Sequence, residues 1–146
     1  MISTRIDDVI AEHEIGTISE ARRQTIHALS GSHRLGIISN VWGQPPRFEA
    51  NLQGTGIFDC FEHIVWSSEH HAIKPSPRLY QIALDYWQTD PARILYVGND
   101  LKRDVGGSTA AGMKSVWIDV HQAGLPDNGP QPDAVVLDLV ELHPGP

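Results

Sequence analysis

The chain has 146 residues, of which 40% are apolar and 20% are charged, and this length and composition are typical of one globular domain. Eleven Lys and Arg residues against eighteen Asp and Glu give a net charge of −7, which opposes binding to nucleic acid and to anionic membrane surfaces. The single cysteine, Cys60, excludes an intrachain disulfide, and no stretch matches a signal peptide or a membrane helix, so we expect a cytoplasmic protein.

Two helical patterns precede the first predicted strand. They run from Thr4 to His13 and from Ser19 to Leu29, and Gly31 is expected to end the second. We interpret residues 1–33 as a helical lead-in and residues 34–146 as the core of a single domain that covers residues 1–146.

From Leu35 onward, short apolar runs alternate with helical patterns, which predicts an α/β fold. Apolar runs of this kind are typical of a parallel sheet that is covered on both faces. In chain order, the predicted strands are Leu35 to Ser39, His63 to Trp66, Ile94 to Val97, Ser115 to Ile118 and Ala134 to Leu137.

Two further helices are predicted between the later strands. Ser76 and Pro77 form a helix start, with the Ser side chain as the expected cap, and a second helix is expected from Leu101 to Ala111 before Gly112. The stretch from Gln122 to Asp133 is rich in Gly and Pro and predicts a surface loop. The residues expected to share the buried face of the first helix are Leu79, Ile82, Ala83 and Tyr86.

Polar residues follow the ends of the predicted strands, where doubly wound sheets bind their ligands. Ser39 and Asn40 come at the end of the first strand, where a hydroxyl and nearby amides can hold an anion or simply form a turn. Lys74 lies before a helix start, where its ammonium can neutralise a phosphate or a carboxylate, although a single loop lysine is often only solvated. Trp42 lies two residues beyond Asn40, where a substrate could reach it.

A cluster of polar residues also follows the third predicted strand. Asp100 and Asp104 are four residues apart, so on a helix their carboxylates face the same way and offer the oxygen ligands that Mg²⁺ prefers. Asn99 is a possible neutral ligand. The alternative is that these acids only cap the helix, which the helix dipole favours without a metal.

Three segments together resemble the haloacid dehalogenase-like (HAD) hydrolase superfamily. They read LGIISN at residues 35–40, IKPSPRLYQIAL at 73–84 and ILYVGNDLKRDVGGSTAAGMKSVWID at 94–119. The resemblance extends roughly from Ser19 to the end of the chain. It implies a three-layer, Rossmann-like core with a mostly parallel sheet, and hydrolysis of a small phosphorylated or otherwise anionic molecule.

The resemblance also implies roles for the polar residues. Ser39, with Asn40, corresponds to the family's phosphate-binding motif, and Lys74 to the lysine that stabilises charge on the nucleophile and on the intermediate. The acids of the fourth motif hold Mg²⁺ in this family. Counting from Gly98 places Asn99 at the first acid, whereas counting back from Asp104 favours Asp100.

The family's nucleophile is the first Asp of a D-x-D-x-(T/V) motif after an N-terminal strand, and this sequence has no such motif. Asp7 and Asp8 lack the spacing, and Asp119 and Asp138 fall in segments where the family has no nucleophile. We therefore expect a truncated domain, without the usual central strand, that is inactive alone. The resemblance implies that residues 1–33, if they are not only a helical lead-in, are the remnant of the family's cap. A homodimer or a partner chain is expected to complete the sheet.

Three functional interpretations follow. The first is a phosphohydrolase-type domain that is inactive alone because the nucleophilic motif is missing. The second is a non-catalytic module that binds an anion, a metal or a partner. The third is a fragment similar to 2-haloacid dehalogenases, which share the fold and the Asp nucleophile but use no metal, and Asn99 favours this interpretation slightly.

Overall fold

The computed structural model describes residues 14–143, and the contacts between Cα atoms divide the chain into two compact units. The first unit ends at Ala72 and the second begins at Ile73. The expected helix from Thr4 to His13 lies outside the described residues. The expectation of a single domain over residues 1–146 stays a prediction, and each unit is described by itself below.

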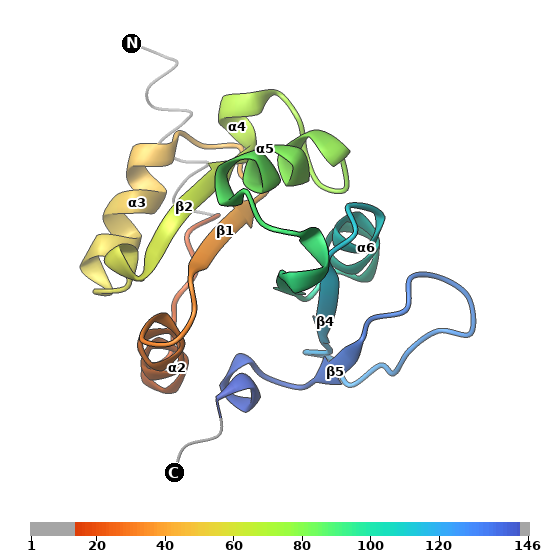
Figure 1. The fold of residues 1–146 in the computed structure, drawn as a ribbon. Coiled ribbons are helices and arrows are strands. Elements are labelled where there is room, and N and C mark those ends of the chain that lie inside the picture. Colours follow the sequence, from red (N-terminus) through yellow and green to blue (C-terminus); the bar gives the residue numbers. More distant parts are fainter. Residues whose placement is uncertain (1–13, 144–146) are drawn as a thin grey trace. The chain divides into compact units, whose positions relative to one another are not determined.

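The first unit is built around two parallel strands. Gly36 lies opposite His63 and Ser39 opposite Trp66 in their register. Phe48 packs its ring against Trp66 with 5.4 Å between the ring centroids, so the helix that carries Phe48 covers β2 (Figure 1). In chain order the elements are α2 (Glu20–Ser30), β1 (Leu35–Ser39), α3 (Pro45–Gly54), the 3₁₀ helix η1 (Phe58–Cys60), β2 (Phe61–Trp66) and α4 (Ser67–His70).

The start of α2 follows from its sequence. The Ser19 hydroxyl accepts a hydrogen bond from the backbone N–H of Arg22 at 3.3 Å, which satisfies one of the amides left over at a helix start. Thr25 and Ile26 are buried, and Gly31 follows the last residue of the helix. The prediction for residues 19–29 is therefore confirmed to within one residue at each end.

The second unit holds three parallel strands in the order β3-β4-β5, with Gly98 opposite Trp117. The short helix α6 lies against β4 (Figure 1). In chain order the elements are α5 (Pro77–Trp87), the 3₁₀ helix η2 (Pro91–Arg93), β3 (Leu95–Gly98), the π-helix η3 (Leu101–Gly106), α6 (Gly107–Ala110), β4 (Lys114–Ile118), β5 (Ala134–Val136) and the 3₁₀ helix η4 (Leu139–Leu142).

The predicted α/β fold class with parallel strands is confirmed. All five predicted strands are present, and their ends differ from the prediction by at most two residues. The strands form two separate sheets, β1-β2 and β3-β4-β5. Residues 122–133 form the predicted loop between β4 and β5, and this loop extends away from the sheet of the second unit (Figure 1).

The two later helices differ in detail from the prediction. Ser76 precedes α5 and Pro77 is its first residue, as predicted, but the Ser76 side chain makes no capping hydrogen bond. Tyr86 is 45% exposed rather than buried, and the fully buried tyrosine is Tyr80, which shares a face with Leu79 and Ala83.

The predicted helix over residues 101–111 begins as a π-helix and continues as α6. The N–H of Val105 reaches the carbonyl of Asp100, five residues earlier, at 3.3 Å. Gly112 has a φ of +83°, the left-handed conformation that was expected to end this helix. Within residues 14–143, no helix is long and apolar enough to span a bilayer.

Candidate functional site

The loop after β1 is held by a buried serine. The Ser67 hydroxyl accepts a hydrogen bond from the N–H of Val41 at 2.8 Å and donates one to the carbonyl of Val41 at 3.0 Å. Both residues are buried, so each hydrogen bond satisfies a backbone group that water does not reach. Ser67 therefore fixes the chain two residues beyond Ser39, the last residue of β1.

A carboxylate holds the next part of this loop. Glu14 accepts hydrogen bonds from the N–H groups of Trp42 and Gly43, at oxygen–nitrogen distances of 2.8 to 3.0 Å. Successive N–H groups that converge on one anion form a small positive concavity in the backbone. The side chain of Trp42 is 74% exposed, consistent with the expectation that a substrate could reach it.

In the second unit, Lys74 belongs to a mostly buried polar cluster. Its ammonium donates to Asp104 Oδ1 at 2.6 Å and to the Tyr96 hydroxyl at 3.2 Å, and the peptide bond to Pro75 is cis. Only 13% of the Lys74 side chain and 6% of the Asp104 side chain are exposed. Lys74 is thus not a solvated surface lysine.

The backbone at the end of β3 holds the Asp104 carboxylate in place. Asp104 Oδ2 accepts the N–H of Asp100 at 3.0 Å, while its other oxygen faces Lys74. A Cβ atom at Gly98 would overlap the Asp104 carboxylate. The glycine that ends β3 is therefore needed for the carboxylate to approach the strand.

Two tyrosines complete this cluster. The Tyr80 and Tyr96 rings lie 5.5 Å apart between centroids, and the Tyr80 hydroxyl donates to the carbonyl of Arg103. Burial, followed by the negative charge of Asp104, raises the pKa of both tyrosines well above the usual value of 10. Both hydroxyls are therefore protonated at neutral pH and act as neutral hydrogen-bonding groups.

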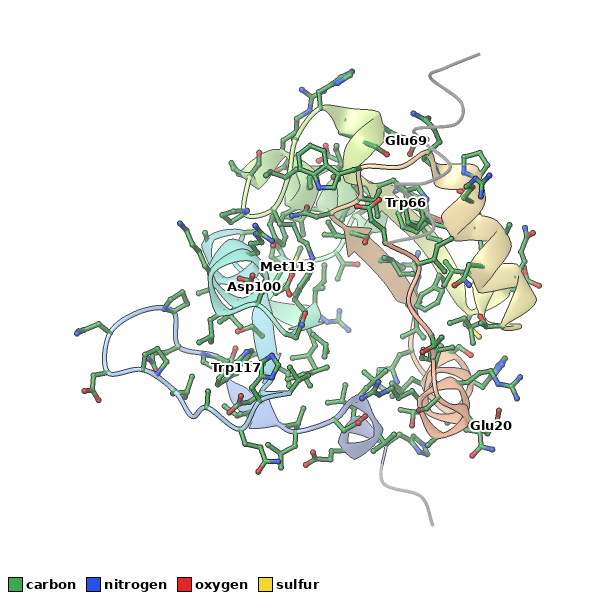
Figure 2. The ribbon with its side chains drawn as sticks, turned by 180° about the vertical axis from the view of Figure 1, so that it is seen from behind. Glu20, Trp66, Glu69, Asp100, Met113 and Trp117 are labelled. Atoms are coloured by element: carbon green, nitrogen blue, oxygen red, sulfur yellow. The ribbon has the colours of Figure 1, made fainter. Side chains whose placement is uncertain are left out.

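Asp100 caps the helix that begins after it, which is the alternative role considered for it above. Its Oδ1 accepts the N–H of Arg103 at 2.7 Å, and its carbonyl begins η3. The indole N–H of Trp117, in β4, donates to the carbonyl of Asn99 at 3.1 Å. This hydrogen bond holds Asn99, the residue before the capping Asp100, against β4. Figure 2 labels Asp100 and Trp117 in this part of the second unit.

The side chains at this strand end offer oxygen donors of the kind that Mg²⁺ binds, namely two carboxylates and one amide. Asp104 forms an ion pair with Lys74. Across residues 14–143, no group of three or more Asp, Glu, His or Cys side chains is placed to hold a metal ion. The donors from Asn99, Asp100 and Asp104 therefore fit magnesium in chemical type, with one carboxylate already paired to a cation.

The two other aspartates considered for a nucleophile hold backbone turns. Asp119 accepts the N–H groups of Ala123 at 3.0 Å and Gly124 at 2.8 Å. Burial raises the pKa of Asp119, but the hydrogen bonds from the Gly124 and Ala123 amides outweigh it, so the net pKa is lowered. Asp138 caps η4 together with Glu141. Asp7 and Asp8 lie outside the described residues.

The structure brings Lys74, Asp104 and the backbone of Asp100 together in the second unit, while Ser39 and Asn40 lie in the first. Sequence reasoning overlooked Ser67, although this serine directly follows β2 and the search for polar residues after strand ends would have found it. It also overlooked Tyr96, because a tyrosine inside an apolar strand resembles a core residue.

The second unit thus belongs to the class of α/β domains with parallel strands, and it places a mostly buried lysine–carboxylate pair close to the end of β3. The model of the haloacid dehalogenase-like hydrolase family matches residues 1–118, and the chain belongs to this family.

The chain spans about half the length of the curated relatives that it matches. It is 31% identical to a pyrimidine 5′-nucleotidase of Escherichia coli, over 81% of this chain and 52% of that protein. It is 32% identical to a phosphoserine phosphatase of Thermus thermophilus, over 86% of this chain and 46% of that protein. The solved structure of a 2-haloacid dehalogenase from Pseudomonas syringae matches with a TM-score of 0.73 and 25% identity, over 86% and 51% of the two chains.

Proposed function

We propose that this chain is the part of a phosphohydrolase-type enzyme that binds a phosphate group of a small phosphorylated molecule. The observation that supports this most directly is the buried ammonium of Lys74, held 2.6 Å from Asp104 where β3 ends. A mostly desolvated, fixed ammonium attracts a phosphoryl oxygen more strongly than a solvated one does. Similarity to two phosphatases agrees with this substrate class.

The other proposed phosphate contacts are those that the family resemblance assigns. Ser39 would donate its hydroxyl to a phosphoryl oxygen, with Asn40 beside it as a further polar contact. Lys74 would stabilise negative charge on the phosphoryl group and on an attacking carboxylate. These groups bind and stabilise charge, but none of them is a carboxylate nucleophile.

We propose that the chain alone does not turn over substrate. The nucleophilic carboxylate would have to come from polypeptide that this sequence does not contain, such as a different partner chain that also completes the sheet. A second copy of this chain could complete the sheet but would bring no nucleophile. That the chain spans about half the length of the curated relatives it matches supports this view.

Asp100, Asp104 and Asn99 are the proposed magnesium ligands. When bound, the ion would supply electrostatic stabilisation of the phosphoryl oxygens. Because Asp104 is paired with Lys74, we expect weak binding of the ion. A titration with Mg²⁺ tests this through the Trp117 indole N–H signal in NMR, since that N–H donates to Asn99. The signal, assigned with Trp117→Phe, should shift in the wild type and stay unchanged in Asp100→Asn.

The central experiment is a calorimetric titration with inorganic phosphate. Lys74→Ala and Ser39→Ala should each weaken binding, by tenfold or more for Lys74→Ala because a charge-assisted contact is lost. Arg34→Ala is the control, since Arg34 precedes β1, at the end opposite Ser39, and forms an exposed pair with Glu62. Unchanged phosphate affinity in a folded Lys74→Ala variant would contradict the proposed site.

A hydrolysis assay tests the proposed lack of turnover. With p-nitrophenyl phosphate and Mg²⁺, the purified chain should give no product above background. Robust hydrolysis that survives Asp7→Asn and Asp8→Asn would show that the chain has a nucleophile we have not identified. Phosphate binding without hydrolysis by any reconstituted assembly would instead favour a non-catalytic binding module.

A second candidate is the dehalogenase reaction, which the similarity to the Pseudomonas syringae enzyme and the neutral Asn99 favour. A 2-haloacid carries a carboxylate, which Lys74 would bind as it would a phosphate. Competition between 2-chloropropionate and phosphate, followed by calorimetry, distinguishes the two. Tighter binding of the haloacid, unchanged by Mg²⁺, would favour the dehalogenase interpretation.

A further inference from the structure

Lys74 is the proposed charge-stabilising group, so the direction of its ammonium matters as well as its charge. A lysine has four methylene groups between its backbone and its nitrogen, and holding such a side chain in one geometry costs conformational entropy. One ion pair with Asp104 fixes the separation of the two groups but leaves the ammonium able to swing about the carboxylate oxygen. A second contact is needed to fix its direction.

Tyr96 supplies that contact. Its hydroxyl accepts a hydrogen bond from Lys74 Nζ at 3.2 Å and donates one to Asp104 Oδ1 at 3.4 Å, which closes a triangle with the ion pair. The ammonium also lies 5.7 Å from the centroid of the Tyr96 ring, within the range of a cation–π contact. One side chain therefore touches both members of the pair.

The Tyr96 ring is itself held in place. The Tyr80 ring packs against it, and the Tyr80 hydroxyl donates to the carbonyl of Arg103, in the helix that carries Asp104. Tyr80 is fully buried, and a Cβ atom at Gly107 would overlap its hydroxyl. The tyrosine pair is thus fixed from α5 on one side and from the η3–α6 segment on the other.

The geometry points to Tyr96 as a positioning residue: its hydroxyl and ring hold the Lys74 ammonium in one direction against Asp104. This inference rests on the proposed function for its purpose, since a fixed ammonium is useful only where an anion is to be bound. The orientation of Lys74 can nevertheless be measured without any ligand.

The first test measures the mobility of the Lys74 side chain by ¹³C relaxation at Cε. The chain has three lysines, Lys74, Lys102 and Lys114, so Lys102→Arg and Lys114→Arg assign the signals. In the wild type, Lys74 should be the most ordered of the three. Tyr96→Phe should lower the order parameter of Lys74 toward that of Lys102.

The matched control for this measurement is Tyr86→Phe, which removes the same hydroxyl from a tyrosine of α5 that is 45% exposed. It should leave the order parameter of Lys74 unchanged. An order parameter that is equally high in Tyr96→Phe and in the wild type would overturn the inference, whatever the chain binds.

A double-mutant cycle on phosphate affinity separates positioning from a general effect on the fold. Tyr96→Phe should weaken phosphate binding by about fivefold in the wild type and leave it unchanged in a Lys74→Ala background. Equal weakening in both backgrounds would mean that Tyr96 acts by another route and would overturn the inference. If Lys74→Ala itself leaves phosphate affinity unchanged, the proposed function fails, and the relaxation measurement still decides the role of Tyr96.

Discussion

The two strand ends that carry the candidate residues are stabilised in different ways. After β1, in the first unit, the side chains of Ser67 and Glu14 bond to backbone groups of the loop. After β3, in the second unit, charged and phenolic side chains bond to one another around Lys74 and Asp104. The first arrangement shapes a peptide loop, whereas the second holds a buried charge.

This difference determines which substitutions the chain tolerates. Loss of a neutral hydrogen bond to the backbone leaves one or two polar atoms unsatisfied and costs about 1–3 kcal/mol. Loss of one member of a buried ion pair leaves a charge without compensation and costs about 3–5 kcal/mol. The second unit should therefore be more sensitive to single substitutions than the first.

The largest effect is expected from Asp104→Ala, which leaves the Lys74 ammonium largely buried without its counter-charge. It should lower the free energy of unfolding by about 4 kcal/mol, measured by urea denaturation. Glu62→Ala is the control, because the Arg34–Glu62 pair of the first unit is about half exposed and should contribute less than about 1 kcal/mol. Equal losses in the two variants would remove the contrast between the two regions.

Gly98→Ala should come next, with a loss of about 3 kcal/mol, because the new methyl group overlaps the Asp104 carboxylate and must displace it. Gly54→Ala, at the end of α3, is the matched control, since a methyl group there meets open space. Thermal unfolding followed by circular dichroism measures both. A Gly98→Ala protein as stable as the wild type would mean that the carboxylate can move without cost.

A smaller effect, about 2 kcal/mol, is expected from Ser67→Ala, which removes both hydrogen bonds to Val41 in the first unit. The neighbouring Ser68 is the control: among the described residues its buried hydroxyl has no hydrogen-bond partner, so Ser68→Ala should be neutral or slightly stabilising. Urea denaturation gives both values. A loss from Ser67→Ala as large as that from Asp104→Ala would contradict the ranking of the two regions.

The smallest effect concerns pH and belongs to the first unit. Burial, followed by the charge of His70, lowers the pKa of His63 below its usual value of 6.5. The unfolded chain therefore binds a proton more readily than the folded one, so stability should fall as the pH drops below about 6.5. The thermal unfolding midpoint of the wild type should fall between pH 7.5 and pH 5.5, and the midpoint of His63→Gln should fall by less over the same range. An identical fall in both would assign the effect to other groups, and His33→Gln, on the surface, is the control.

Most of the fold could be predicted because its signals are local. Apolar runs bounded by Gly, Pro and Ser placed all five strands, and Gly112 marked a helix end through its need for a positive φ. The errors have a common cause. Whether Tyr80 or Tyr86 faces the core of the second unit depends on what packs against α5, and that packing lies outside the helix's own sequence.

The candidate site likewise has features that could be predicted from the sequence and features that depend on tertiary packing. The sequence by itself determined the family and singled out Lys74, Asp100 and Asp104 as candidate residues, because the spacing of motif residues along the chain is a local property. Only the tertiary structure decided that Lys74 pairs with Asp104, thirty residues away, and that Tyr96 touches both. The partner of a buried charge is set by which elements pack together, because burial makes an unpaired charge costly, and no run of neighbouring residues carries that information.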